Sequence, residues 1–483
     1  MKTIKTDPGA RRLMESLRSM GYDCSTAIAD LVDNSIEAGA SEIDIDIIAK
    51  QEVRQDFIPA REGYPAAIVI ADNGKGMNRD QLHEAMRFGT LQEYSLRDLG
   101  KYGLGLKTAS LSQCKVLTVL SKAKSETGTR PRKHCMRWDV DHVYETNDWE
   151  LLIPDEDELT PWEKKILDNL VAKDHGTVVL WTDLDGNLSP LSSNNVNDRE
   201  RLLAHVIEDV GEHLRMVFHR FMQGSVPGRR KLNITLCGQP LVLWDPFCRN
   251  EKTQELEIIS LRMALEDLDR SKIEETVTVS PYILPREDEF SSQPAWKDAS
   301  GPKNWNQQQG FYFYRNHRLL QAGGWSRLRT SDEHTKLLRV AVDFSGELDN
   351  AFAINITKMR ANIPPKIKDE INTHISAWIK LAKLRYDGKS PETISALPSQ
   401  STENVLPTPT LSTSTVTDQN KDIAAENILK IFTEDRKKWN MQYFCQCLVE
   451  LAMALHGGEV DVNEIPVNLI QKIYKDIYDK DSR

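Results

Sequence analysis

Several features that identify common classes of protein are missing from this sequence of 483 residues. No stretch approaches the roughly 18 consecutive apolar residues of a membrane-spanning helix, so we expect no membrane partner. Residues 1–11 contain no apolar signal core, which makes the cytoplasm the expected location, or the nucleus in a eukaryotic cell. The seven cysteines are odd in number and form no Cys-x-x-Cys pair, so we expect reduced structural thiols.

Two widespread nucleotide-binding patterns are absent as well. No G-x-x-x-x-G-K-[ST] stretch occurs, which excludes a P-loop. The glycine-rich loop at residues 100–105 does not follow a strand directly, as the dinucleotide-binding fingerprint of a Rossmann fold requires. A nucleotide site in this chain would have to be of another kind.

The composition that is present belongs to a globular protein, with 40% apolar and 28% charged residues. A chain of this length is too long for one ordinary core, so two or three domains are expected. The net charge of −10 argues against a protein that coats nucleic acid over its whole surface.

The charge is unevenly distributed along the chain. Residues 301–386 hold 14 Lys and Arg against 7 Asp and Glu, a local balance of +7 in a chain whose net charge is −10. This pattern predicts either a confined surface that contacts a polyanion such as DNA, or an ordinary solvated charged face.

Residues 1–190 carry the pattern of an α+β sandwich with helices on one face. Apolar and acidic residues alternate over 43–48, which is typical of a half-buried strand, and further strands are expected at 66–71, 116–121 and 178–181.

A long amphipathic helix and a second α/β region are expected over 191–386. Apolar residues recur at helical spacing at Leu203, Val206, Ile207, Val210, Leu214, Val217, Phe218 and Phe221. The region contains residues 310–320, Gly-Phe-Tyr-Phe-Tyr-Arg-Asn-His-Arg-Leu-Leu, and ends in a helix predicted over 365–385.

The last part of the sequence changes character. Residues 387–420 are dense in Ser, Thr and Pro, and they hold too little apolar surface to fold alone, so we expect a flexible linker. It leads to a small helical unit at 421–483, which is short enough to need a protein partner or a docking surface.

The first block that carries chemistry is a helix at residues 29–39. Asp30, Asn34 and Glu37 are spaced to share one face of it. An amide oxygen beside a carboxylate suits Mg²⁺, and a carboxylate one turn away can orient or deprotonate an attacking water. The alternative is an ordinary solvated helix face.

The second block is an apolar strand that ends in a glycine turn, residues 70–77, Ile-Ala-Asp-Asn-Gly-Lys-Gly-Met. Asp72 can accept hydrogen bonds from an exocyclic amine such as that of adenine. Gly74 and Gly76 permit positive φ and the close approach of a ring. The alternative is a plain Asp-Asn-Gly hairpin turn.

The third block is a glycine-rich loop that runs into a helix, residues 100–110. Its glycines let backbone N–H groups converge on phosphates, and Lys107 can add a point charge on a β or γ phosphate. A flexible loop is the alternative.

The three blocks in this order, with His-Gly-Thr-Val-Val at residues 175–179, resemble the GHKL superfamily of gyrase B, heat-shock chaperone ATPases, histidine kinases and MutL. Residues 102–110 and 310–320 are most similar to the MORC-type branch. The resemblance implies a Bergerat-type α+β ATP-binding sandwich over residues 1–190. It further implies an α/β transducer-like domain over 191–386.

Carried over residue by residue, the resemblance implies ATP and Mg²⁺ as cofactors. Asn34 would bind the metal, Asp72 would read adenine with support from the Thr177 hydroxyl, and a lid at 76–105 would hold the phosphates. The expected cofactor-binding residues are Asn34, Asp72, Gly74, Gly76, Met77, Gly103, Leu104, Gly105, Lys107 and Thr177. The expected catalytic residues are Asp30 and, as the transducer lysine on the γ-phosphate, Lys358.

The sequence departs from the family pattern at Asp30. The family usually has Glu four residues before the Mg²⁺ asparagine, so the carboxylate stands one methylene shorter, roughly 1.5 Å. A misplacement of about 1 Å can lower a rate on the order of a hundredfold. We therefore expect either slow hydrolysis or a helix that lies closer to the nucleotide. ATP binding is unaffected by this departure.

These observations favour an ATPase whose lid closure drives homodimerisation, with the second domain relaying nucleotide state to DNA through residues 301–386 or to a protein partner. The alternative is a nucleotide-sensing scaffold with slow turnover that recruits an effector through its C-terminal helices. A histidine kinase is not expected, because no histidine precedes His83. The chain after residue 386 is too short for the remaining domains of a topoisomerase.

Overall fold

The computed structural model describes residues 3–4, 8–19, 21–50, 65–89, 99, 105–125, 132–170, 174–266, 272–354 and 362–388. All of them belong to one compact unit, Met1–Leu397, and the second unit, Pro398–Arg483, lies outside the described residues. The expected C-terminal helical unit and all but the first two residues of the expected linker are therefore predictions. Among the described residues, no helix is long and apolar enough to cross a membrane.

The first sheet has seven strands in the order β4-β3-β5-β2-β1-β6-β7. The strands are β1 Glu42–Ile48, β2 Ala67–Asp72, β3 Cys114–Lys122, β4 Lys133–Asp139, β5 Gly176–Leu184, β6 Asn233–Leu236 and β7 Gln239–Pro240. Neighbours pair antiparallel except β1 and β6, which are parallel. The four strands expected from apolar patterning are thus present as β1, β2, β3 and β5.

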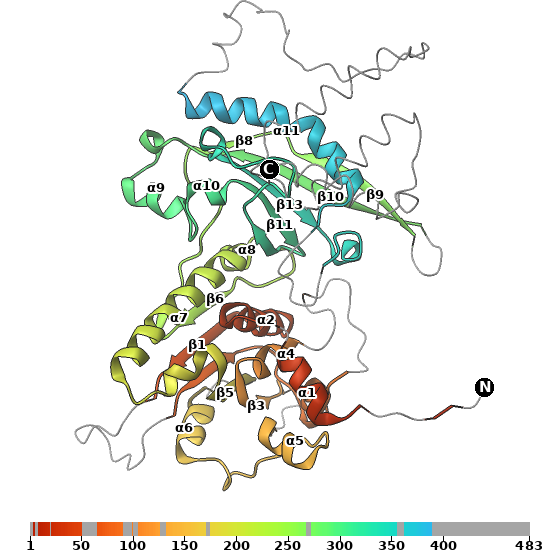
Figure 1. Cartoon of the computed structure of the whole chain (residues 1–483), viewed down its shortest axis with the longest axis vertical. Helices are drawn as coiled ribbons and strands as arrows, with labels where there is room; N and C mark the ends of the chain where they lie inside the picture. The colour runs from red at the N-terminus through yellow and green to blue at the C-terminus, as the bar shows by residue number, and fades with distance from the viewer. Residues whose placement is uncertain are drawn as a thin grey trace, which may run out of the picture. The chain divides into compact units, whose positions relative to one another are not determined.

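Both faces of this sheet are covered by helices, which is more than the expected single face. Alternate residues of β2 divide between two cores: Ile68 and Ile70 face one, Ala67 and Val69 the other. The first core is closed by α1 Ala10–Arg18, α2 Cys24–Glu37, α4 Gly105–Leu111 and α7 Val196–Val217 (Figure 1). The second core is closed by α6 Pro161–Leu170, through Trp162, Ile166 and Leu167.

Helix α7 and the short α8 His219–Gln223 form the amphipathic segment predicted from the sequence. Six of its predicted core positions are buried, namely Val206, Val210, Leu214, Val217, Phe218 and Phe221, and Leu203 and Ile207 are half-buried. After α8 the chain returns to the first sheet as β6 and β7. The first sheet therefore extends to residue 240, past the boundary expected at 190.

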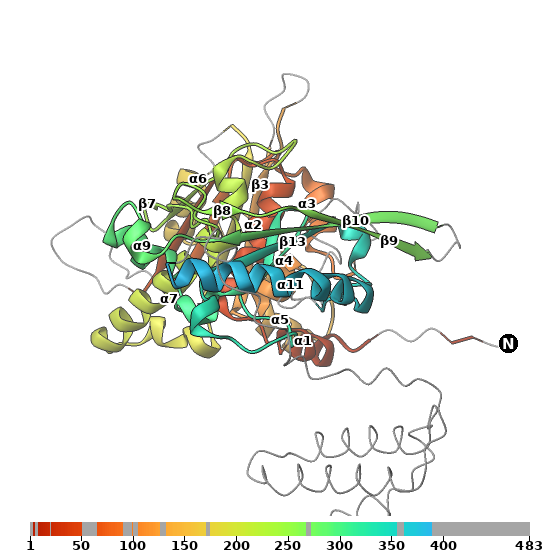
Figure 2. The same cartoon turned by 90° about the horizontal axis from the view of Figure 1, so that it is seen from above.

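The second sheet has six strands, in the order β12-β11-β13-β10-β8 with β9 paired to β10. The strands are β8 Gln254–Glu255, β9 Ile259–Glu266, β10 Lys272–Ile283, β11 Gly310–Arg315, β12 Arg318–Ala322 and β13 Leu338–Phe344. Helix α11 Pro365–Tyr386 lies across this sheet, as Figure 2 shows from above. It contributes four buried side chains to the core of the second sheet, namely Ile367, Ile371, Ile375 and Trp378. The helix predicted over 365–385 is confirmed.

The remaining described elements are short. They are α3 Arg79–Met86, α5 Val140–Thr146, α9 Gln293–Ala299 and α10 Trp305–Gln308, with 3-10 turns η1 Gly186–Ser192, η2 Glu287–Glu289, η3 Glu333–Thr335 and η4 Gly346–Leu348.

Strands β11 and β12 form a hairpin with a two-residue turn. Asn316 and His317 both have positive φ, 47° and 69°, as a type I′ turn requires. Arg315 and Arg318 close the turn as a directly opposed pair, so their side chains leave the same side of the hairpin. Of these two arginines, Arg318 reaches α2 of the first-sheet region, where it donates to Asp33, whereas Arg315 bonds Asp349.

Candidate functional site

Helix α2 is buried along almost its whole length. It begins after Asp23, whose carboxylate accepts a hydrogen bond from the Thr26 amide at 2.7 Å. From Thr26 to Ile36 only Asn34 is exposed. An exposed amide on an otherwise buried helix fits a ligand-binding role, and because Asp30 is buried the face that it shares with Asn34 is not solvated throughout.

Asp30 is held by two side chains. The Tyr22 hydroxyl donates to its Oδ2 at 3.0 Å, and Nη2 of Arg318 lies 3.7 Å from its Oδ1. Burial, and next the charge of Asp30, raises the pKa of the Tyr22 phenol, so the hydroxyl stays a donor. A Cβ placed on Gly105 would lie 3.7 Å from Oδ2 of Asp30, so the carboxylate borders the start of α4.

Asp72 ends β2 and pairs in register with Thr177 on β5. Its Oδ2 accepts a hydrogen bond from the Ser35 hydroxyl at 3.1 Å, and its Oδ1 accepts from the Gly74 amide at 2.8 Å. The bond from Ser35 ties α2 to the strand end, which brings the Asn34 region and Asp72 together.

The hydroxyl of Ser121 on β3 joins three parts of the same site. It lies 2.8 Å from Oγ1 of Thr177, accepts from the Met77 amide at 2.9 Å, and is 3.2 Å from the Gly176 carbonyl oxygen. Sequence analysis missed Ser121, Ser35 and Tyr22. The pairing of Ser121 with Thr177 follows from sheet order, which local patterns do not contain.

Two glycines allow these strand ends to approach at backbone distance. Gly76 has φ 63°, and a Cβ there would lie 1.9 Å from the Lys122 carbonyl oxygen. Gly176 has φ 144°, and a Cβ there would lie 2.1 Å from the Asp72 carbonyl oxygen. Both positions therefore require glycine for packing, whatever they contribute to a bound ring.

Lys107, expected to contact phosphates, is 1% exposed on α4. Its Nζ donates to the Ala85 carbonyl oxygen at 2.8 Å, at the end of α3. Burial lowers the pKa of Lys107 to about 8, although Glu84 acts in the opposite direction. Gly103, Leu104 and Lys358 lie outside the described residues, so their expected roles are predictions.

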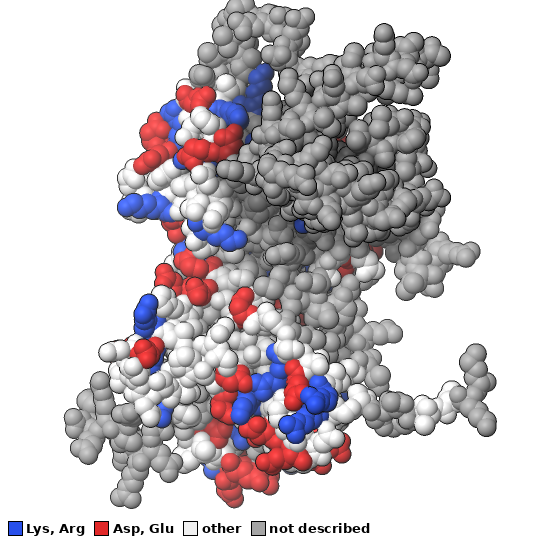
Figure 3. All heavy atoms as spheres, in the orientation of Figure 1, with Lys and Arg blue, Asp and Glu red and all other residues white. Residues whose placement is uncertain are grey.

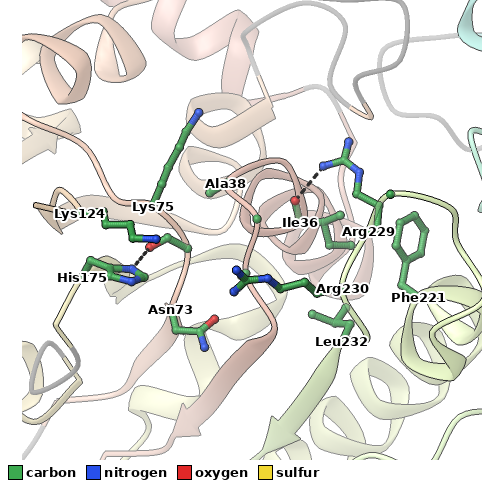
Figure 4. A pocket seen from close by; sticks show the side chains of 14 residues that line it. Ile36, Ala38, Asn73, Lys75, Lys124, His175, Phe221, Arg229, Arg230 and Leu232 are labelled. Carbon is green, nitrogen blue, oxygen red and sulfur yellow. Dashed lines mark hydrogen bonds between the residues drawn. The ribbon is translucent and has the colours of Figure 1, made fainter. Parts of the chain in front are cut away.

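A pocket of about 260 Å³ lies beside the turn that follows β2 (Figure 4). Basic side chains dominate its polar lining: Lys75, Lys124, Arg229, Arg230 and His175, with no Asp or Glu. His175 donates from Nδ1 to the Gly74 carbonyl oxygen at 2.6 Å, and Arg229 turns away to bond the Ile36 carbonyl oxygen and Glu37. A pocket lined by positively charged side chains favours the binding of anionic groups.

These elements lie within a stretch of the chain that matches a known protein family. Residues 22–177 match the family described as histidine kinase-, DNA gyrase B-, and HSP90-like ATPase. The resemblance inferred from the four sequence blocks is confirmed, and the chain contains a GHKL domain in this stretch.

The curated relatives include MORC and MutL proteins. Protein MICRORCHIDIA 5 of Arabidopsis thaliana is 27% identical over 132 residues, 26% of this chain and 17% of the relative. MORC family CW-type zinc finger protein 1 of Mus musculus is 30% identical over 105 residues, 21% of this chain and 10% of the relative. DNA mismatch repair protein MutL of Shewanella denitrificans is 34% identical over 108 residues, 21% of this chain and 14% of the relative. The matches thus span a small part of each relative's length.

Two solved structures are similar over most of the chain. The N-terminal domain of a DNA repair protein shares 14% identity at a TM-score of 0.38, covering 78% of this chain and 98% of that one. The ATPase and transducer domains of DNA topoisomerase II from Balamuthia mandrillaris share 14% identity at a TM-score of 0.36, covering 75% and 85%. These scores are too low to carry a functional argument.

The residues present fit ATP with Mg²⁺. The exposed Asn34 amide suits a metal that keeps phosphate oxygens and waters as its other ligands. Among the described residues, no group of three His, Cys, Asp or Glu side chains forms a metal site of its own. An Mg²⁺ ion at Asn34 would therefore depend on the nucleotide's phosphates.

The state of Lys107 gives a test of its expected phosphate contact. Phosphates beside Lys107 should raise its pKa from about 8, so nucleotide binding at about pH 8.5 should take up a large fraction of a proton. Calorimetric titration of ATP in buffers of different ionisation enthalpy measures this uptake. It should disappear in Lys107→Met. Equal proton uptake in wild type and Lys107→Met would mean that the phosphates do not bind beside Lys107.

Proposed function

We propose that this protein is a Mg²⁺-dependent ATPase in which nucleotide binding closes a lid, drives homodimerisation and is relayed by the second sheet to DNA or a protein partner. The observation that carries the proposal is the convergence of α2 and the ends of β2, β3 and β5 within the segment that matches the GHKL family. Ser35 joins the first two of these elements, and Ser121 joins the last two.

The expected roles are those that the family resemblance implies. Asn34 would hold Mg²⁺, which would supply positive charge beside the phosphates. Asp72 and Thr177 recognise adenine, with Gly74, Gly76 and Met77 along the base. Gly103, Leu104, Gly105 and Lys107 hold phosphates, and Lys358 contacts the γ-phosphate.

Asp30 carries the catalytic part of the proposal. It lies beside Gly105 at the phosphate end of the expected site, and its two oxygens face Tyr22 and Arg318. A carboxylate held in this way can orient the attacking water and accept its proton.

A second candidate function is a nucleotide-sensing scaffold with slow turnover, which recruits an effector through residues 421–483. The observation that favours it is the engagement of the short Asp30 side chain by two partners within the protein. ATP binding is common to both functions, and turnover separates them.

Replacement of Asp30 tests the choice between these functions. Asp30→Asn keeps the side-chain volume but removes the base, so single-turnover hydrolysis should fall about 10²- to 10⁴-fold. ATP affinity, measured by calorimetry on the same samples, should be retained and serves as the control. Equal hydrolysis rates in wild type and Asp30→Asn would support the scaffold.

Dimerisation is tested by the mass of the protein in solution. The proposal predicts a monomer without nucleotide and with ADP, and a doubled mass with a non-hydrolysable ATP analogue and Mg²⁺. Light scattering coupled to size exclusion measures it. Asn34→Ala should stay at the monomer mass under all three conditions. A wild-type mass that does not change when the analogue is added would contradict nucleotide-driven dimerisation.

The charge of residues 301–386 supports DNA as a partner less strongly than its count suggests. Arg315, Arg318 and Arg339 are buried, and the first two are neutralised by carboxylates. Exposed basic residues include Lys366 and Lys380 on α11. On the described part of the face in Figure 3, basic and acidic side chains are interspersed. We place the DNA contact of the proposal on these exposed lysines.

DNA binding through α11 makes a prediction about salt. Affinity for a DNA duplex should fall steeply as salt rises, and Lys366→Glu with Lys380→Glu should weaken it and reduce the logarithmic salt slope by about one per lysine. Fluorescence anisotropy measures both quantities. Arg201→Glu, an exposed charge reversal on α7, is the matched control. Affinity that is absent or insensitive to salt would remove DNA from the proposal.

A further inference from the structure

The tip of the β11–β12 hairpin sends its two arginines to different places. Arg315 bonds Asp349 within the second-sheet region at 2.6 and 2.9 Å, and donates to the Leu99 carbonyl oxygen at 3.3 Å. Arg318 reaches α2 of the first-sheet region. Its Nε donates to Asp33 at 2.9 Å, and its Nη2 lies 3.7 Å from Oδ1 of Asp30. The second region therefore touches the candidate base directly.

The contact between Arg318 and α2 is deeply buried. The side chains of Arg318, Asp30 and Asp33 are 4%, 3% and 1% exposed. The guanidinium carbon lies 5.8 Å from the centre of the Phe218 ring, at the junction of α7 and α8. Desolvation of such charges offsets most of their attraction, so a buried ion pair is a weak source of stability. The effect of Arg318 on the neighbouring Asp30 carboxylate therefore matters more than its effect on stability.

Both oxygens of Asp30 are engaged from outside α2. Tyr22 donates to Oδ2, and Arg318 faces Oδ1. A short acid has little reach of its own, so the direction of its carboxylate depends on these two neighbours. Tyr22 precedes α2 in the chain, whereas Arg318 comes from β12, so of these two described neighbours it is the arginine that makes the direction depend on the second sheet.

We propose that Arg318 is a positioning residue for ATP hydrolysis, which acts through Asp30 and makes turnover depend on the docking of the β11–β12 hairpin against α2. This inference rests on the proposed ATPase function. Water adds to the γ-phosphorus, its proton passes to the Asp30 carboxylate, and the bond to the β-phosphate oxygen breaks to leave ADP and phosphate. Arg318 holds the carboxylate in the direction from which it accepts that proton.

A purely structural role for Arg318 would act through Asp33, which is the nearer partner at 2.9 Å. The two roles differ in how Arg318 and Asp30 couple. If Arg318 acts through Asp30, its removal loses its effect once Asp30 no longer serves as base. If it only joins the two regions, its removal lowers the rate equally with or without Asp30.

The experiment is a double-mutant cycle in the full chain, with single-turnover hydrolysis and ATP affinity measured separately. Arg318→Gln should lower kcat about 10- to 100-fold and leave ATP affinity unchanged, because the expected fault is a misplaced base. In the Asp30→Asn background, Arg318→Gln should lower the rate no further. Arg318→Lys should recover part of the lost rate, since the lysine ammonium keeps a positive charge near Asp30 but lacks the several N–H donors of the guanidinium.

Two further variants keep the result decisive. Where Asp30→Asn leaves too little turnover to measure, the Asp30→Glu background replaces it. In that background Arg318→Gln should lower the hydrolysis rate by a smaller factor than in wild type. Arg220→Gln is the matched control, because Arg220 is also an arginine that contacts the second sheet: among the described residues its hydrogen bonds go to Asp343 on β13, and its guanidinium lies over the Tyr314 ring on β11. It should keep a rate close to that of wild type.

Three outcomes would overturn the inference while the ATPase proposal stands. In the first, the wild type hydrolyses ATP and Arg318→Gln has the same kcat. In the second, Arg318→Gln lowers the rate by the same factor in every Asp30 background. In the third, Arg220→Gln lowers the rate as much as Arg318→Gln does. Wild-type protein that binds ATP without turnover would instead contradict the proposed function itself.

Discussion

The burial of α2 is the constraint on which the rest of the structure depends. The helix is covered by the first sheet, by α4 and by α7, and the tip of the β11–β12 hairpin reaches it from the second sheet. Because so little of it meets solvent, the polar residues at its C-terminal half have defined surroundings. Ser35 fixes Asp72, Asp33 receives Arg318, and Asn34 is left exposed.

Local patterns predicted the elements that carry the site, and long-range pairing explains what they missed. Alternation over residues 43–48 and the glycine turn after residue 72 are short-range features, so β1 and β2 were recognisable. Partners such as Ser121 and Arg318 lie far along the chain from the residues they contact. Arg318 belongs to the motif at residues 310–320, but no local pattern predicts its contact with α2. The departure at Asp30 was visible in the sequence, but the neighbours that hold it were not.

Charge counted along the sequence and charge displayed by the fold are different quantities. The basic surplus of residues 301–386 includes arginines that the structure uses internally, since Arg339 donates to the Pro246 and Ala299 carbonyl oxygens and Arg315 is matched by Asp349. A guanidinium serves well inside a protein because it stays charged and donates in several directions. Part of the surplus is therefore buried inside the protein and is not displayed on its surface.

The parallel pairing of β6 with β1 has a consequence for how this chain divides into modules. Four registered residue pairs join these strands, and β6 lies beyond the long helix α7. A fragment cut after residue 190 would leave the backbone of β1 as an open edge, which invites pairing between copies. Any unit that was exchanged between proteins as an intact nucleotide module would need to carry α7, α8 and β6 with it.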